Sequence, residues 1–346
     1  IPILVGARPV SELKTECDKG KVASCAELGL AYQHGRKVIK DLKRAAQLFE
    51  RACLAKHQGA CTDLGALYLT GQGVHKNPKQ AVRLYLAACK QGHPRGCASA
   101  GYTMLKGLGT KQNTKAARQY LKKGCLAGSP WGCLILATLN KKEKDAAARR
   151  RWIEKACALK SPEGCALAGQ LMVEGKGGPE NKSLAVKHFL FACERGLARA
   201  CALAGKRFER GEGVRRDPSK AARLYAAGCK VKDPASCDNL GMCAIRGIGI
   251  PKDYSRAKRA FKQACDGGLG RGCTHLGLMH HQGLKVVKNM KRAATFYELG
   301  CKHNDARGCG YLGLLLLGGK GIQKNTARAR KLLARACKQG LQFACP

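Results

Sequence analysis

The sequence has few acidic and few aromatic residues. Only 23 of its 346 residues are Asp or Glu, against 64 Lys and Arg, so the formal net charge is +41. This excess is too large to be neutralised within the protein, and it favours an anionic partner: an acidic protein, a nucleic acid, an anionic glycan or an anionic lipid. Because aromatic residues make up 5% of the chain and no RNA-recognition motif appears, base stacking is not predicted. A polyanion would be held through its charges alone.

Long apolar runs and the usual catalytic motifs are also missing. No run of 18 apolar residues exists, which excludes a membrane-spanning helix. The sequence contains no Cys-x-x-Cys pair of the kind that binds zinc. No phosphate-binding loop, Ser-His-Asp arrangement or carboxylate pair stands out. Ser11 and Lys14 match the Ser-x-x-Lys of penicillin-recognising enzymes, but the supporting Ser-Asp-Asn and Lys-Thr-Gly motifs are lacking. We therefore predict no catalytic, cofactor-binding or metal-binding residues.

Cysteine is abundant and strictly spaced. Twenty of the 21 cysteines form ten Cys-x7-Cys pairs, and Cys243 is left over. Successive pairs start 36 residues apart, except for a step of 32 residues between Cys125 and Cys157. A fixed period of this length indicates a repeat protein whose units contact only their neighbours. The pairs are Cys17 with Cys25, Cys53 with Cys61, Cys89 with Cys97, Cys125 with Cys133, Cys157 with Cys165, Cys193 with Cys201, Cys229 with Cys237, Cys265 with Cys273, Cys301 with Cys309, and Cys337 with Cys345.

Each repeat is predicted to contain two helices. After Cys61, apolar residues recur at helical spacing until the helix-breaking Gly71-Gln-Gly73. Asn77 and Pro78 then resemble an N-cap and a first helical residue, and a second helix runs to about Cys89. The N-cap position is Asp or Asn in nine repeats: Asp41, Asn77, Asn113, Asp145, Asn181, Asp217, Asp253, Asn289 and Asn325.

A glycine recurs inside the first helix, four residues after the second cysteine of the pair. Glycine in a helix costs about 1 kcal/mol relative to alanine. Its recurrence therefore predicts two helices that cross too closely for a side chain. The positions are Gly29, Gly65, Gly101, Gly169, Gly205, Gly241, Gly277 and Gly313.

The 32-residue unit lacks four residues between Cys133 and Asp145. Asp145 lies twelve residues before Cys157, as the N-cap does in the other repeats, so the second helix keeps its length. We expect the first helix or its loop to be shorter there, with a local change in the curvature of the array.

The residues from Leu64 to Cys89 resemble the Sel1-like repeat, a relative of the tetratricopeptide repeat. The matching pattern is Leu-Gly-x-x-Tyr-x-x-Gly-x-Gly-Val-x-x-Asn-Pro-x-x-Ala-x-x-x-Tyr-x-x-Ala-Cys, and it returns from Leu203 to Tyr225. The paired cysteines look like the cysteine-rich, exported bacterial subgroup, or a mitochondrial intermembrane-space assembly factor of similar design. The resemblance implies an all-α, right-handed solenoid of αα-hairpins, which we expect to run as a single domain over residues 1–346 with about nine helix pairs.

In that family each Cys-x7-Cys pair is a disulfide that joins adjacent helices. Closing such a nine-residue loop would stabilise the fold by about 2.6 kcal/mol in the chain-entropy model. Buried reduced thiols are the alternative. Disulfides would place the protein in an oxidising compartment: exported to the periplasm or the extracellular space, or in the intermembrane space, and not in the reducing cytosol. Cys243 is expected to be an apolar helix residue or a free thiol for an intermolecular disulfide.

Basic residues recur in the loops between the two helices of a repeat. Equivalent loops of a solenoid stack into a ridge, so we predict a basic edge comprising Arg36, Lys37, Lys76, Lys111, Arg215, Arg216, Lys252, Lys288 and Lys324. Together with the concave face, this edge predicts a non-enzymatic scaffold or assembly factor for acidic proteins.

Two alternatives follow from other observations. The resemblance implies weak β-lactam or peptidoglycan-fragment binding or hydrolysis in some members of the bacterial subgroup. The array also reaches Cys345 without a polar capping helix, which suggests end-to-end self-association into a filament or a larger complex.

Overall fold

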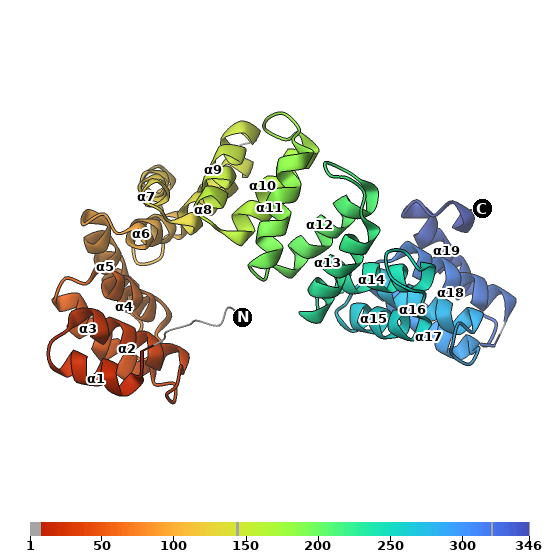
Figure 1. Ribbon diagram of the computed structural model, residues 1–346, viewed down its shortest axis with the longest axis horizontal. Coiled ribbons are helices and arrows are strands. Elements are labelled where there is room, and N and C mark those ends of the chain that lie inside the picture. The colour runs from red at the N-terminus through yellow and green to blue at the C-terminus, as the bar shows by residue number, and fades with distance from the viewer. Residues whose placement is uncertain (1–7, 143–144, 320, 346) are drawn as a thin grey trace. The chain divides into compact units, whose positions relative to one another are not determined.

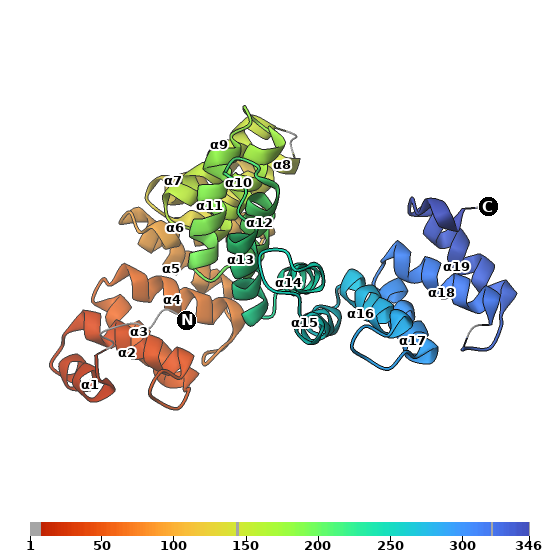
Figure 2. The same ribbon diagram turned by 45° about the vertical axis from the view of Figure 1, so that its right-hand side comes forward.

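The computed structural model describes residues 8–142, 145–319 and 321–345, and in these ranges the chain is entirely helical (Figures 1 and 2). Nineteen α-helices and one short 3-10 helix, Gln342–Ala344, are present there, without strands. The predicted all-α fold is therefore confirmed. The helices are α1 Val10–Asp18, α2 Val22–His34, α3 Leu42–Leu54, α4 Gln58–Thr70, α5 Pro78–Lys90, α6 Pro94–Lys106, α7 Thr114–Leu126, α8 Pro130–Lys142, α9 Ala146–Ala158, α10 Pro162–Glu174, α11 Lys182–Glu194, α12 Ala198–Arg210, α13 Pro218–Lys230, α14 Pro234–Arg246, α15 Tyr254–Asp266, α16 Gly270–Gln282, α17 Met290–Lys302, α18 Ala306–Gly318 and α19 Thr326–Lys338.

The chain divides into two compact units, which meet in sequence between Glu180 and Asn181. In each unit a helix that begins near the second cysteine of a pair, here called an A helix (α2 to α18, even numbers), alternates with a capped B helix (α3 to α19, odd numbers). Successive A helices also contact one another, α4 with α6 and α6 with α8 in the first unit, and α12, α14, α16 and α18 in turn in the second. The A helices therefore form one face of each unit. That residues 1–346 make a single solenoid stays a prediction.

The B helices begin where the sequence predicts. At all nine N-caps the Asp or Asn side chain accepts a hydrogen bond from the backbone N–H three residues later. Asn77 Oδ1, for example, accepts from the N–H of Gln80 at 3.0 Å. This bond satisfies one of the donors that a first helical turn leaves unpaired. Apart from α8, whose following residues lie outside the described ranges, the A helices end instead at a glycine in the left-handed region, such as Gly71 with φ 75°.

The recurring A-helix glycines face a large side chain of the B helix. A Cβ added to Gly65 would lie 2.7 Å from Cε1 of Tyr85, and one added to Gly277 would lie 2.7 Å from Cδ1 of Tyr297. Both tyrosines are buried. The predicted close crossing is present at seven of the eight glycines, Gly169 being the exception for which no contact is described, and packing of an aromatic or leucine side chain offsets the helix propensity lost there.

The shortened repeat loses its residues from the loop, because its helices keep their length. The A helix α8 and the B helix α9 each have 13 residues, like α4 and α5. Residues 71–77 separate α4 from α5, whereas residues 143–145 separate α8 from α9. The N–H of Asp145 still donates to the carbonyl of Asn140 at 3.0 Å, as the N–H of Asn77 does to Tyr68 at 2.8 Å. The N-cap of α9 therefore bonds to the same position of its A helix as the N-cap of α5 does, although fewer loop residues connect the two helices.

All ten cysteine pairs are disulfides in the register that the family resemblance implied. Their Cα–Cα distances lie between 4.3 and 4.9 Å. Nine of the bonds join the end of one helix to the first turn of the following A helix, across the turn between two repeats, and the tenth joins the end of α19 to Cys345, just after the 3-10 helix. A closed loop this short removes conformational freedom from the unfolded chain without distorting the turn.

Candidate binding surfaces

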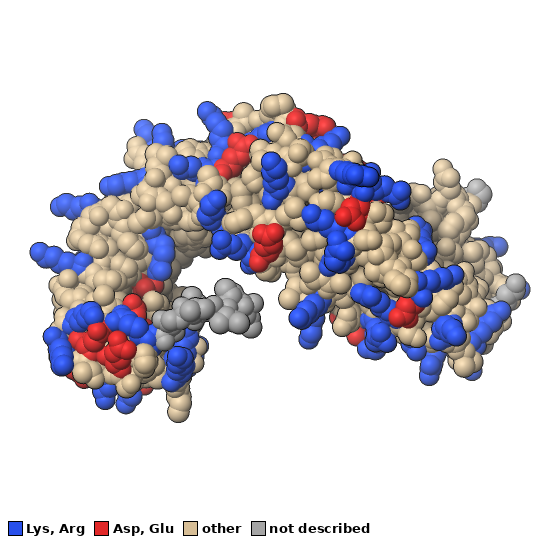
Figure 3. Space-filling model, in the orientation of Figure 1, with Lys and Arg blue, Asp and Glu red and all other residues tan. Residues whose placement is uncertain are grey.

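The predicted basic edge lies on the loops that run from an A helix to the next B helix. All nine residues of this edge are exposed. Several of them occupy the same position, where the side-chain stem lies over the glycine that ends the A helix: a Cβ on Gly71 would lie 3.1 Å from Lys76 Cβ, and one on Gly319 would lie 3.3 Å from Lys324 Cβ. This packing fixes the stems and leaves the ammonium groups in water. In Figure 3 Lys and Arg side chains are spread over both units, whereas Asp and Glu form small groups.

A second basic surface, which the sequence reasoning missed, lies on the A helices of the second unit. A cavity of about 650 Å³ is lined by residues of α12, α14, α16 and α18, with Arg216 and Tyr225 at its side. Six cationic side chains line it against two acidic ones. We call this surface the arginine groove; its charged residues are Lys206, Glu209, Arg210, Arg216, Asp238, Arg246, Arg271 and Arg307.

Both acids of the arginine groove are engaged by protein groups. Asp238 is fully buried, accepts from Arg271 Nε at 2.5 Å and lies 2.7 Å from Nδ1 of His275. Glu209 accepts a hydrogen bond from the buried Tyr225 hydroxyl at 2.7 Å. No further acid lines the cavity, although two of the remaining cations have acidic partners outside it: Arg210 lies 3.5 Å from Glu212, and Arg307 lies 3.9 Å from Asp305. The position of Asp238 is Ala26 or Thr62 in other repeats, so this buried carboxylate is a departure from the repeat pattern.

The local electrostatics of the arginine groove are strongly positive. The pKa of Lys206 is lowered, first by partial burial and then by the neighbouring Arg210, Arg207 and Arg271. Like charges disfavour the charged form of a lysine, and an anion bound in the groove would relieve that repulsion. The groove is thus suited to carboxylate or phosphate groups, which arginine recognises through paired N–H donors.

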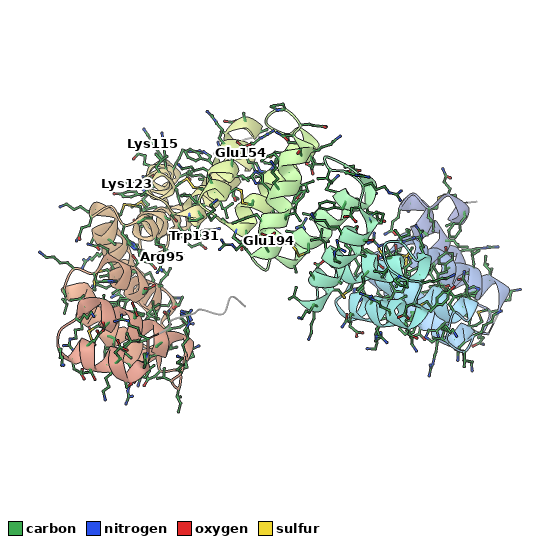
Figure 4. All side chains as sticks on the ribbon, in the orientation of Figure 1. Arg95, Lys115, Lys123, Trp131, Glu154 and Glu194 are labelled. Atoms are coloured by element: carbon green, nitrogen blue, oxygen red, sulfur yellow. A yellow bond between two sulfur atoms is a disulfide. The ribbon has the colours of Figure 1, made fainter. Side chains whose placement is uncertain are left out.

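A mostly apolar cavity of about 720 Å³ lies in the first unit. It is formed where the A helices α6, α8 and α10 begin, and includes Pro94, Pro130, Trp131 and Pro162. Trp131 is 42% exposed and its ring lies 5.3 Å from that of Tyr102. In Figure 4 Trp131 and Arg95 lie on one side of α8 and α6, and the exposed Lys115 and Lys123 of α7 point to another. Arg95 is anchored by an ion pair with Asp63. An exposed aromatic ring beside an ordered arginine is typical of protein-binding surfaces.

The other predicted residues do not meet in a reactive arrangement. Ser11 and Lys14 are exposed on α1, and no bond between them is present. Cys243 is a free cysteine, buried among Tyr225, Leu240 and other apolar residues of the second unit. Burial raises the pKa of this thiol to about 11. A protonated, inaccessible thiol is a poor nucleophile and cannot reach a partner chain without local opening.

The sequence-family comparison matches most of the chain. The Sel1 repeat model matches residues 22–57, 59–93, 94–129, 162–197, 198–230, 234–269, 270–305 and 306–341. The chain belongs to the Sel1 repeat family. The range 130–161, which holds the repeat with the shortened loop, is left unmatched.

Solved structures of Sel1 repeat proteins resemble this chain in fold. One is c5321, a protective antigen present in uropathogenic Escherichia coli strains with an SLR fold: TM-score 0.70, 21% identity, covering 98% of this chain and 81% of that one. Another is a Sel1 repeat protein from Oxalobacter formigenes, with a TM-score of 0.50 and 20% identity over 98% of this chain and 89% of that one. Helicobacter pylori cysteine rich protein B is 31% identical over 38% of this chain and 93% of its own, with a TM-score of 0.32. No curated protein matched the chain.

Proposed function

We propose that this Sel1 repeat protein is a non-enzymatic scaffold that binds acidic segments of other proteins in the arginine groove, with the basic edge as an additional electrostatic surface. Sel1 repeats suggest protein binding, and the ten disulfides suggest an oxidising compartment outside the cytosol. Within that limit we propose an exported protein of the periplasm or extracellular space, with the mitochondrial intermembrane space as the alternative. In the described residues no helix is both long and apolar enough to cross a membrane.

The observation that carries the proposal is the excess of cations over acids on four successive A helices. An extended acidic peptide laid across these helices would meet Lys206 and Arg210 on α12, Arg246 on α14, and Arg307 on α18. Arg271 and Asn239, which are hydrogen-bonded at 3.2 Å, would present further ordered polar groups. Charge pairing of this kind steers association and sets specificity more than it adds affinity.

Binding of a fluorescent Glu-rich peptide, followed by anisotropy, tests the proposal. Arg246→Glu/Arg307→Glu should weaken binding by about tenfold or more at low salt, because reversing two charges lowers the net charge of the groove by four units. The matched control is Arg223→Glu/Lys258→Glu, which makes the same charge change at exposed positions of the B helices α13 and α15. Equal losses for both pairs would assign the binding to overall charge and contradict the groove.

Two alternatives remain predictions of the sequence. Hydrolysis of nitrocefin, or acylation of the purified protein by a β-lactam, would support the enzyme alternative, and a lack of both would reject it. Sedimentation at several concentrations distinguishes a filament or larger assembly from a stable monomer. A pull-down from the native compartment would name the partner.

A further inference from the structure

Two of the loops between A and B helices depart from the repeat pattern in their backbone. In six loops the third residue is a glycine in the left-handed region: Gly73, Gly109, Gly177, Gly213, Gly249 and Gly321. The same position is Lys37 in the first unit, with φ 58°, and Lys285 in the second, with φ 52°. A lysine is strained in this region because its Cβ approaches the following carbonyl oxygen. Lysine also stands at positive φ in three turns between repeats, at Lys56, Lys160 and Lys232, so the backbone angle alone does not single out these two loops.

The glycine loops lie against the preceding repeat. A Cβ on Gly73 would lie 2.2 Å from the carbonyl oxygen of Leu42, and one on Gly249 would lie 2.1 Å from that of Pro218. Both oxygens belong to the first residue of the preceding B helix. Lys285 carries that Cβ, so its loop cannot approach the start of α15 in the same way; for Lys37 the equivalent residue, 6, lies outside the described residues.

The same two loops carry the most exposed large apolar side chains of the described residues. Ile39 is 91% exposed and Val287 is 86% exposed, and they occupy equivalent positions, two residues after the strained lysine. In the glycine loops this position is polar, charged or proline: His75, Lys111, Pro179, Arg215, Pro251 and Gln323. A single exposed aliphatic side chain is common on a protein surface, but these two share one position of the repeat on a basic edge.

The valine before each exposed side chain is partly buried. Val38 and Ile39 both line a cavity beside Tyr32, and Val286 packs against a cluster that includes Phe261. The valine thus holds each tip against its unit, and the next residue is left largely in solvent. The base of each loop is fixed by a backbone hydrogen bond, from Asp41 N–H to the Tyr32 carbonyl at 3.0 Å and from Asn289 N–H to the His280 carbonyl at 2.9 Å.

Lysines flank both exposed side chains. Residues 36–44 contain five basic residues and one acid, the N-cap Asp41, and residues 284–292 contain four basic residues and no acid. Each tip is therefore an aliphatic side chain between two lysines: Lys37 and Lys40 around Ile39, and Lys285 and Lys288 around Val287.

We propose that these two tips, one in each unit, attach the protein to the surface of an anionic lipid bilayer. Ile39 and Val287 would enter the layer below the headgroups, where their exposed area is removed from water, while the flanking lysines contact lipid phosphates. A single protruding aliphatic residue offers too little area for the core of a stable protein interface. Lipids rearrange around an inserted side chain, so insertion into a bilayer needs no surface of complementary shape. Isolated exposed aliphatic residues with cationic neighbours can therefore bind there. This surface is separate from the arginine groove and does not depend on it.

Co-sedimentation with vesicles tests the proposal, using phosphatidylcholine alone and phosphatidylcholine mixed with an equal part of phosphatidylglycerol. The wild-type protein should bind the anionic vesicles and not the neutral ones. Ile39→Ser/Val287→Ser leaves every charge in place and should weaken binding by about tenfold, since two aliphatic side chains no longer leave water. Lys40→Gln/Lys288→Gln should weaken it as well; Gln112 occupies the same position in another repeat, so the loop accepts this residue.

The matched control is Leu54→Ser/Val231→Ser. These residues are 80% and 58% exposed, one in each unit, at the turns between repeats. The control pair should bind vesicles like the wild type, and so should Arg246→Glu/Arg307→Glu of the arginine groove. If the wild type does not bind anionic vesicles, or Ile39→Ser/Val287→Ser binds them like the wild type, the proposal is wrong. In the second case the attachment is by charge alone. Circular dichroism spectra confirm that each variant is folded.

Discussion

Gly241 of α14 lies directly against the ring of Phe261 of α15: a Cβ on Gly241 would lie 2.5 Å from Cε1 of the ring. Phe261 is fully buried, so the ring has no free space into which to move. Gly241→Ala should therefore destabilise the protein by about 1–3 kcal/mol through overpacking, although alanine is the better helix former. Urea unfolding followed by circular dichroism measures the change.

The control for this substitution is Gly59→Ala in α4. A Cβ at Gly59 would lie 3.1 Å from Cε1 of His57 and 3.9 Å from Nε2 of His93, so the His57 ring, which accepts a hydrogen bond from the N–H of Ala60, would have to shift by only a few tenths of an ångström. The free energy of unfolding of Gly59→Ala should stay the same or rise by the helix propensity of alanine, up to about 1 kcal/mol, and the urea midpoint should change accordingly. If Gly241→Ala also raises the midpoint, the crossing of α14 and α15 is looser than the structure has it.

The disulfide between Cys265 and Cys273 should contribute measurably to stability. Replacement of both cysteines by alanine should cost about 2–4 kcal/mol, because the unfolded chain regains the freedom of the closed loop. The single substitution Cys243→Ala leaves all ten disulfides, so this variant should respond to a reducing agent as the wild type does. An unchanged urea midpoint for the double variant would show that the pair is not bonded in solution.

Cys243 should be unreactive until the protein unfolds. Native protein treated with iodoacetamide at neutral pH should gain no label, whereas protein in urea without reductant should gain one label per chain, counted by mass spectrometry.

The raised pKa of the Cys243 thiol also has a consequence for stability. The folded state holds the thiol protonated, so this part of the stability is complete below the ordinary pKa of about 8.5 and is lost as pH rises toward about 11. Cys243→Ala should lose less stability across that pH range than the wild type, and equal losses would contradict the shift.

The features that the sequence alone predicts correctly are those that repeat. The N-cap of α5 at Asn77, the glycine at Gly65 and the spacing of the cysteines recur every 36 residues, and each has a local physical cause that residue type reveals. The arginine groove follows this period only in part: Arg210 and Arg246 stand 36 residues apart, as do Arg271 and Arg307. Lys206 has Met242 at the equivalent position of α14, and Asp238 replaces an uncharged residue in a single repeat. Only the stacking of the A helices brings these residues together.

The two loop tips, at Ile39 and Val287, also could not be predicted from the sequence alone. Lys37 and Ile39 appear in the sequence as two more residues of a basic, variable loop. The backbone angle of Lys37 and the exposure of Ile39 are known only from the structure. They show that this loop is equivalent to the loop with Lys285 and Val287. A signal was nevertheless available, since both loops have lysine where the other loops have their second glycine.

Asp238 should act in opposite directions on stability and on binding. Asp238→Asn removes the charge that pairs with Arg271 and His275, so the folded state should lose about 1–3 kcal/mol; Arg271 is 42% exposed and can still turn to water. The same change adds one unit of positive charge to the arginine groove, so the affinity for the Glu-rich peptide should rise. Asp266→Asn, an exposed acid of α15, is the control and should change neither quantity by much. A fall in affinity for Asp238→Asn would contradict the prediction, and would mean that the ion pair holds Arg271 in the orientation that the peptide needs.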